Sequence, residues 1–91
     1  MTWSIVLARS AVKSLDRLAA DERKRIVEAI LSLKENPTPP GKKVKPLKAI
    51  DGNLLRLRVG SRRVIYEIVK DEIHILEIVV RGDLERWLSR R

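Results

Sequence analysis

The sequence predicts an α+β fold in which an N-terminal strand and an antiparallel helical hairpin pack on an antiparallel sheet, followed by a short C-terminal helix. Apolar residues recur at helical spacing over residues 10–36 and alternate with polar residues over residues 54–81. Very short links separate the alternating runs, which is typical of a three-strand meander. Because 91 residues with 44% hydrophobic content can form one thin core, we expect a single domain over residues 1–91.

The N-terminal part of the chain predicts one strand and two helices. Residues 3–7 alternate as a short strand does. Ser10 is placed to cap a first helix and Asp21 a second, and Asn36-Pro37 ends the second helix because the residue before a proline disfavours the helical conformation. The stripes expected to be buried are Ala11, Val12, Leu15, Leu18 and Ala19, then Ile26, Ala29, Ile30 and Leu33. Little chain joins the two helices, so they should form an antiparallel hairpin.

Residues 37–52 (PTPPGKKVKPLKAIDG) are the only loop-like tract of the sequence. Its prolines prevent regular structure over most of the tract, and we expect Leu47 and Ile50 to anchor it in the core. Two interpretations of its positive charge stay open, a solvated connector and an arm that contacts phosphates. The lysines concerned are Lys42, Lys43, Lys45 and Lys48.

The remaining chain predicts three strands at about 54–59, 62–70 and 72–81, then a short helix that Asp83 caps. Strand alternation decides which side chains share a face. We expect one face of the sheet to pack on the helices. The residues of that face are Leu55, Leu57, Val59, Val64, Tyr66, Ile68, Leu76, Ile78 and Val80. The open face then receives Arg56, Arg58, Arg63 and Arg81, whereas Arg62 points to the helices. Glu67 and Glu77 are placed to orient these guanidinium groups, although a register shift of one residue would scatter the set.

The charge of the chain indicates an anionic partner. The net charge is +8 and the isoelectric point is about 10.5, which favours nucleic acid, an anionic surface or an acidic protein. Like charges that face each other across strands destabilise a sheet, and phosphate would relieve this because it matches the arginine fork. The alternative is a basic surface that serves solubility alone. Phe is absent and other aromatics are scarce, so stacking platforms for bases are not expected.

Several chemistries are excluded by the residue inventory. The chain has no Cys and a single His, His74, so thiolate metal sites and paired-histidine catalysis are excluded. No carboxylate cluster has two-metal spacing, and no Gly-rich phosphate loop occurs. We therefore expect neither a metal nor a cofactor. With no signal peptide and no apolar run of about 20 residues, we expect a cytoplasmic protein without a membrane partner.

The segment LRLRVGSRRVIYEI, residues 55–68, resembles the signature of the RelE/ParE toxin superfamily, which reads approximately YRLRVGDYRVIYEI. The resemblance extends over nearly the whole chain, through the first strand, the helical hairpin, the basic loop and the meander. It implies a RelE-like fold and a microbial toxin that an acidic, helical antitoxin neutralises in a hetero-oligomeric complex.

The resemblance implies one of two targets. RelE-like toxins inhibit translation as metal-independent endonucleases that cut mRNA in the ribosomal A site, and we favour this branch. ParE-like toxins share the fold but poison DNA gyrase without being enzymes. In the RelE branch the catalytic positions correspond to Arg56, Arg58, Arg63 and Arg81. The residues expected to bind RNA are Lys42, Lys43, Lys45, Lys48, Arg86 and Trp87.

The C-terminal run VVRGDLERWLSRR departs from the family pattern. Many RelE-like toxins end with a histidine or arginine pair and a tyrosine, but here Trp87 is the nearest aromatic residue. An indole can stack on a base but cannot accept a proton, so the general base is not identified. Trp87 could equally anchor the last helix. A third reading is a purely regulatory module whose partner is the antitoxin.

Overall fold

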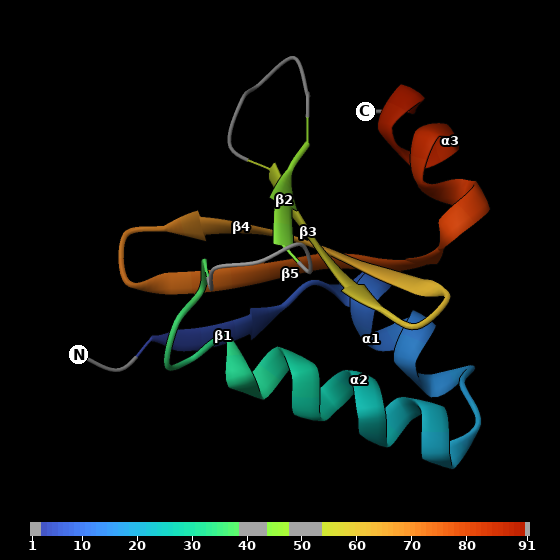
Figure 1. The fold of residues 1–91 in the computed structure, drawn as a ribbon, viewed down its shortest axis with the longest axis horizontal. Coiled ribbons are helices and arrows are strands. Elements are labelled where there is room, and N and C mark those ends of the chain that lie inside the picture. Colours follow the sequence, from blue (N-terminus) through green and yellow to red (C-terminus); the bar gives the residue numbers. More distant parts are fainter. Residues whose placement is uncertain (1–2, 39–43, 48–53, 91) are drawn as a thin grey trace.

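A computed structural model describes residues 3–38, 44–47 and 54–90 and confirms the α+β class (Figure 1). The five strands of the sheet follow the order β1-β5-β4-β3-β2. The elements are β1 (Ser4–Leu7), α1 (Arg9–Asp16), α2 (Ala20–Ser32), β2 (Val44–Pro46), β3 (Leu54–Val59), β4 (Arg62–Val69), β5 (Glu72–Val80), a 3₁₀ turn η1 (Arg81–Asp83) and α3 (Leu84–Ser89). No helix within the described ranges is long and apolar enough to cross a membrane.

The predicted antiparallel meander is present as β3, β4 and β5, and one strand is added at each side. β1 pairs in parallel with β5, from Ser4 opposite Glu72 to Leu7 opposite Ile75. β2 pairs antiparallel with β3. β2 is thus a three-residue strand within the tract 37–52, which was expected to lack regular structure over most of its length. Its proline is tolerated because an edge strand has one side without a ladder.

The helices α1 and α2 cover one face of the sheet, and α3 lies toward the other (Figure 1). α1 packs on β5 and α2 on β3. The predicted side-chain caps are not formed, because Ala8 and Ala19 occupy the N-cap positions. The Ser10 hydroxyl instead donates a hydrogen bond to the Leu76 carbonyl at 2.7 Å, which links α1 to the middle of β5. Asp83 does occupy the N-cap of α3, but without a side-chain capping bond.

The core lies between the sheet and these two helices. Tyr66 is fully buried there, and its hydroxyl donates to the Pro37 carbonyl at 2.6 Å. Burial raises the pKa of Tyr66 to about 12. The predicted packed ring with its hydroxyl at an edge is confirmed. The buried cluster consists of Ala11, Leu15, Leu18, Ile26, Ile30, Leu33, Leu57, Val64, Tyr66, Ile73, Ile75 and Ile78.

The predicted faces are wrong for the first half of β5. Tyr66 lies opposite Ile75 and Ile65 opposite Glu77, so Leu76 has no partner on β4 and forms a bulge. One extra residue reverses the side to which all preceding residues point. Ile73 and Ile75 are therefore fully buried on the helix side, where Leu76 had been expected. Beyond the bulge, the predicted alternation holds.

Candidate functional site

Four arginines converge on the open face of the sheet. Arg58 lies opposite Arg63, and Arg63 lies opposite Val79 on β5, so these residues share a face with Arg56 and Arg81. Together with Gly82, Leu84 and Glu85, the four guanidinium-bearing residues line one open pocket of about 600 Å³. The predicted convergence of Arg56, Arg58, Arg63 and Arg81 is confirmed.

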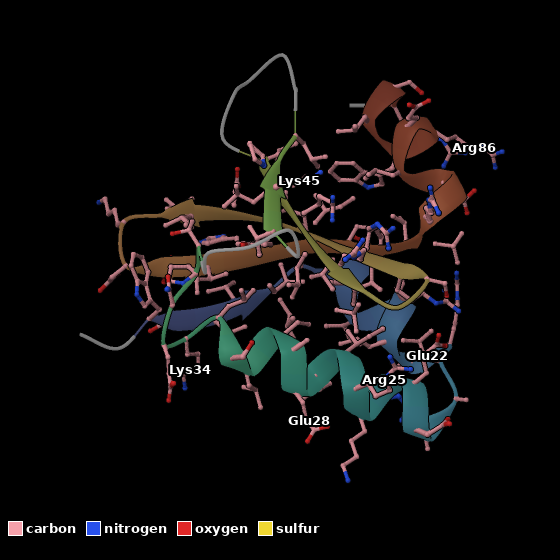
Figure 2. All side chains as sticks on the ribbon, viewed as in Figure 1. Glu22, Arg25, Glu28, Lys34, Lys45 and Arg86 are labelled. Atoms are coloured by element: carbon pink, nitrogen blue, oxygen red, sulfur yellow. The ribbon has the colours of Figure 1, made fainter. Side chains whose placement is uncertain are left out.

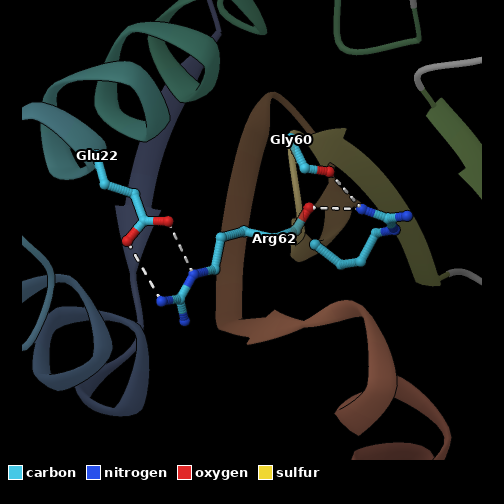
Figure 3. A network of polar contacts seen from close by, with 4 residues as sticks. Glu22, Gly60 and Arg62 are labelled. Atoms are coloured by element: carbon cyan, nitrogen blue, oxygen red, sulfur yellow. Dashed lines mark hydrogen bonds and ion pairs between the residues drawn. The ribbon is translucent and has the colours of Figure 1, made fainter.

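Arg63 is the most enclosed of these arginines, with only 8% of its surface exposed. Its Nη1 donates to the Gly60 carbonyl at 3.0 Å and to the Arg62 carbonyl at 2.9 Å (Figure 3). Burial lowers the pKa of Arg63, and the nearby charges of Arg56, Arg81 and Arg58 lower it further. An arginine stays protonated even so, so the pocket holds concentrated positive charge that an anion would offset.

The next arginine along β4 has a different environment. Arg62 points to the helix side, as predicted, and forms a two-point ion pair with Glu22 in the first turn of α2 (Figure 3). Nε donates to Oε2 and Nη2 to Oε1, each at 3.2 Å. Its charge is therefore balanced within the protein and is not offered to the pocket.

Lys45 is the basic-loop residue that the structure brings to the arginine face. It is exposed on β2 (Figure 2) and lies opposite Arg56, so the two share a face. Leu47 is half-buried and its N–H donates to the Leu54 carbonyl at 2.8 Å, which pins the end of this strand. Lys42, Lys43, Lys48 and Ile50 lie outside the described residues.

Arg86 and Trp87 line a second groove, of about 380 Å³, together with residues of α1 and β5. Trp87 is half-buried, and Arg86 is exposed on α3 with its Nη1 at 3.7 Å from Asp83 Oδ1 (Figure 2). The arginine pocket is lined instead by Leu84 and Glu85 of this helix. Arg86 and Trp87, which were predicted to bind RNA, thus line a second groove that the sequence did not indicate.

Glu85 is the pocket residue that sequence analysis missed. It is the only carboxylate among the described residues that line the arginine pocket. Its spacing of four from Arg81 is one helical turn, a signal that could have placed it there. Glu67 and Glu77, which we expected to orient the arginines, do not line the pocket. Glu77 Oε1 instead accepts hydrogen bonds from Ser14 Oγ and the Ile78 N–H.

The chemistry available to this pocket is that of positive charge and forked donors. Guanidinium groups bind phosphate by two parallel hydrogen bonds, and donors fixed in advance stabilise charge that develops in a transition state. Among the described residues, no group of three or more histidine, aspartate or glutamate side chains is arranged to hold a metal ion. The arrangement is suited to binding a phosphodiester.

The comparison with family models matches residues 5–84 to the ParE toxin of the type II toxin–antitoxin system, parDE. This match covers most of the chain. Among curated protein sequences, none is significantly similar to it.

Solved structures show the same fold. The archaeal RelE–RelB complex from Pyrococcus horikoshii OT3 contains a chain that is 32% identical, with a TM-score of 0.77 over 90% of this chain and 98% of that chain. The RelB–RelE complex from Methanococcus jannaschii gives 25% identity and a TM-score of 0.72, over 90% of this chain and 96% of that one. A mutant of the E. coli toxin RelE in the free state shares only 14% identity but a TM-score of 0.77, over 100% and 98% of the two chains.

Proposed function

The chain belongs to the RelE/ParE superfamily of toxins of type II toxin–antitoxin systems, and we propose that it cleaves mRNA on the ribosome. The observation that carries this proposal is the pocket in which four arginines meet. Such a pocket suits a phosphodiester, and a toxin that only occupied a protein surface would not need it. The 32% identity to the RelE-type chain of the Pyrococcus complex supports the RelE-like branch.

In the proposed reaction, a ribose 2′-oxygen attacks the adjacent phosphorus. A P–O2′ bond forms and the P–O5′ bond breaks, leaving a 2′,3′-cyclic phosphate and a 5′-hydroxyl that takes a proton from solvent. Arg63 and Arg81 bind the scissile phosphate and stabilise the additional negative charge of the phosphorane. Arg56 and Arg58 hold the flanking backbone. Because arginine stays protonated, these residues act by positioning and charge stabilisation.

We assign the proton acceptor for the 2′-hydroxyl to Glu85. It is the one carboxylate among the described residues lining the pocket, and Trp87 has no basic atom to offer. Glu85→Gln should lower kcat by about 10²–10⁴-fold, the usual contribution of a general base, without weakening RNA binding. If Glu85 served only as a counter-ion to the arginines, the same variant would bind RNA more tightly and cleave it no more slowly.

The test of the proposal is a translating extract with a defined codon in the A site. Wild-type protein should cut the message at that codon, with a 2′,3′-cyclic phosphate at the new 3′ end. Intact message at protein amounts that arrest growth would overturn the nuclease function.

Inhibition of DNA gyrase is the second candidate. It is favoured by the match of residues 5–84 to the ParE toxin family and by the absence of tyrosine from the run VVRGDLERWLSRR, residues 79–91. Purified gyrase should lose supercoiling activity on addition of the protein if this candidate is correct. Since the arginine pocket would then have no role, Arg63→Gln should leave gyrase inhibition intact.

The partner we propose is an acidic, helical antitoxin that covers the arginine face in a hetero-oligomeric complex. The net charge of +8 favours binding of an acidic partner. An amphipathic helix of that partner would lie across the arginine face. The similar archaeal chains are in RelE–RelB complexes. Expression of the free protein should arrest growth, and co-expression of the neighbouring small gene should relieve the arrest. A protein that left growth unaffected would instead be the purely regulatory module.

A further inference from the structure

We propose that the Glu22–Arg62 ion pair is a positioning device for Arg63 and Arg81, an inference that rests on the function proposed for their pocket. The first step concerns the β3–β4 turn. Its carbonyls at Gly60 and Arg62 both accept from Arg63 Nη1, at 3.0 and 2.9 Å. The carbonyl between them, Ser61 O, accepts the backbone N–H of Arg81 at 2.9 Å. Three consecutive carbonyls of one turn therefore hold the guanidinium of Arg63 and the backbone N–H of Arg81.

The second step concerns what holds the turn. Arg62 reaches from the end of this turn to Glu22, 40 residues earlier in the chain, with two nearly parallel hydrogen bonds of 3.2 Å (Figure 3). Such a two-point pair fixes orientation as well as distance. The side chains are 28% and 34% exposed, so the pair adds little stability by itself. Its main consequence is that it orients the turn relative to α2.

α2 encloses the turn with a further side chain. A Cβ atom on Gly60 would lie 3.4 Å from Arg25 Nη2, and Gly60 has a φ of +59° that favours glycine. Glu22 and Arg25 come from the same half of α2 (Figure 2). The N-terminal part of α2 thus acts on the pocket although neither of these residues lines it.

Arg62 acts on Arg63 through its main-chain carbonyl, whereas its side chain anchors the turn to Glu22. Adjacent residues of a strand point to opposite faces, so the anchor and the pocket stay separate. Exchanging the two charges of the anchor should therefore leave the pocket intact. This separates positioning from direct attraction of RNA, because an attracting charge could not be moved without loss.

The experiment is a charge-swap cycle of Glu22→Arg, Arg62→Glu and the double variant. Each single variant places like charges against each other, and we expect kcat for codon cleavage to fall about tenfold through misplacement of the arginines, with KM for programmed ribosomes nearly unchanged. The double variant should recover most of kcat. Glu22→Gln is the milder variant if a single swap does not fold.

The outcome that contradicts the proposal is also defined by charge. Arg62→Glu lowers the net charge by two and Glu22→Arg raises it by two. If attraction of RNA were responsible, the two single variants would change KM in opposite directions, and the double variant would not rescue kcat. A double variant as impaired as the singles overturns the positioning role.

A second measurement does not depend on cleavage. The ¹⁵N-edited NMR signals of the Arg63 guanidinium should shift or broaden in each single variant and return in the double variant. Unchanged signals in the singles would overturn the proposal even if the enzyme is active. Conversely, a wild-type protein that does not cleave mRNA would refute the proposed function while these signals still report on the anchor.

Discussion

Arg62 and Arg63 are neighbours on β4, yet their environments are opposite. Arg62 faces the helices, and Glu22 balances its charge. Arg63 faces the pocket, where burial and the charges of three other arginines lower the pKa of its guanidinium group. The difference follows from the alternation of a strand, which places consecutive side chains on opposite faces. One arginine stabilises a local arrangement, and the next is left for an anion.

The same contrast applies to the two faces of the whole sheet. The helix side contains the buried apolar cluster, and the opposite side gathers positive charge on three strands and the turn after β5. We therefore expect substitutions on the helix side to change the free energy of unfolding, and substitutions in the pocket to change activity.

The largest loss of stability is expected at Ile75, a core residue whose face was predicted wrongly from the sequence. Ile75→Ala should lower the free energy of unfolding by about 2–5 kcal/mol, because Ile75 is fully buried and its removal leaves a cavity. Leu76→Ala is the matched control and should cost clearly less, since Leu76 is only half-buried at the bulge. Urea titration measures both. Equal losses would show that the bulge is elsewhere.

In the pocket, Arg63→Gln should reduce codon-specific cleavage by about 10²–10³-fold, by analogy with the loss of one oxyanion donor. The glutamine keeps a polar side chain but removes the charge and the fork. Lys34→Gln is the matched control, because it removes one positive charge from an exposed residue beyond the end of α2 (Figure 2). Circular dichroism should show both variants folded. Equal loss in the control would mean that only net charge matters.

Tyr66 offers a test on the helix side that involves a single oxygen atom. Tyr66→Phe removes the hydrogen bond to the Pro37 carbonyl and should lower the free energy of unfolding at neutral pH by about 1–3 kcal/mol. Cleavage per folded molecule should stay unchanged. A loss of kcat without loss of stability would assign Tyr66 to the catalytic machinery and break the division between the faces.

The pH dependence of the same residue has a definite sign. Burial raises the pKa of Tyr66 to about 12, above the usual value near 10, so the unfolded chain releases this proton first. The stabilising contribution is complete below pH 10 and is lost as the pH rises toward about 12, by up to ~3 kcal/mol. Tyr66→Phe should lack this part of the decline. Because Tyr66 is the single tyrosine, tyrosinate absorbance of the folded protein reports the titration directly.

The smallest effects are expected at the two hairpin turns. Gly60 and Lys70 have φ values of +59° and +57°, a conformation that disfavours a side chain by about 1–2 kcal/mol. Gly60→Ala should therefore destabilise the protein by about 1 kcal/mol and also reduce cleavage, since the Gly60 carbonyl binds Arg63. Lys70→Gly should stabilise it by about 0.5 kcal/mol with no change in activity. Thermal melts measure both.

The faces of β3 and β4 could be predicted because the two-residue turn at Gly60-Ser61 fixes their register. β5 could not be predicted in the same way. Its apolar residues follow one alternation through Ile73 and Ile75 and the other through Leu76 and Ile78, and the change between them is the bulge. A single alternation over the whole strand predicts the wrong face for its first half, because the bulge reverses the side to which those residues point.

For the site, the prediction was better than for β5 as a whole because Arg81 lies beyond the bulge. Its alternation is continuous with Val79, which stays opposite Arg63. Glu85 was missed because α3 alone, with six residues, shows too little periodicity to reveal which side faces the sheet. The one signal was its spacing of four from Arg81, which lies in the preceding turn. β2 was missed because three residues that include a proline cannot display alternation.

The parallel pairing of β1 with β5 sets the order in which the molecule can be completed. Ser4 finds its strand partner only at Glu72, so the first strand stays unpaired until the last strand has been synthesised. Contacts of such long sequence separation slow folding. The residue that follows β5 is Arg81, which completes the pocket. β1 pairing and completion of the pocket therefore depend on the same stretch of chain, β5 and the arginine that follows it.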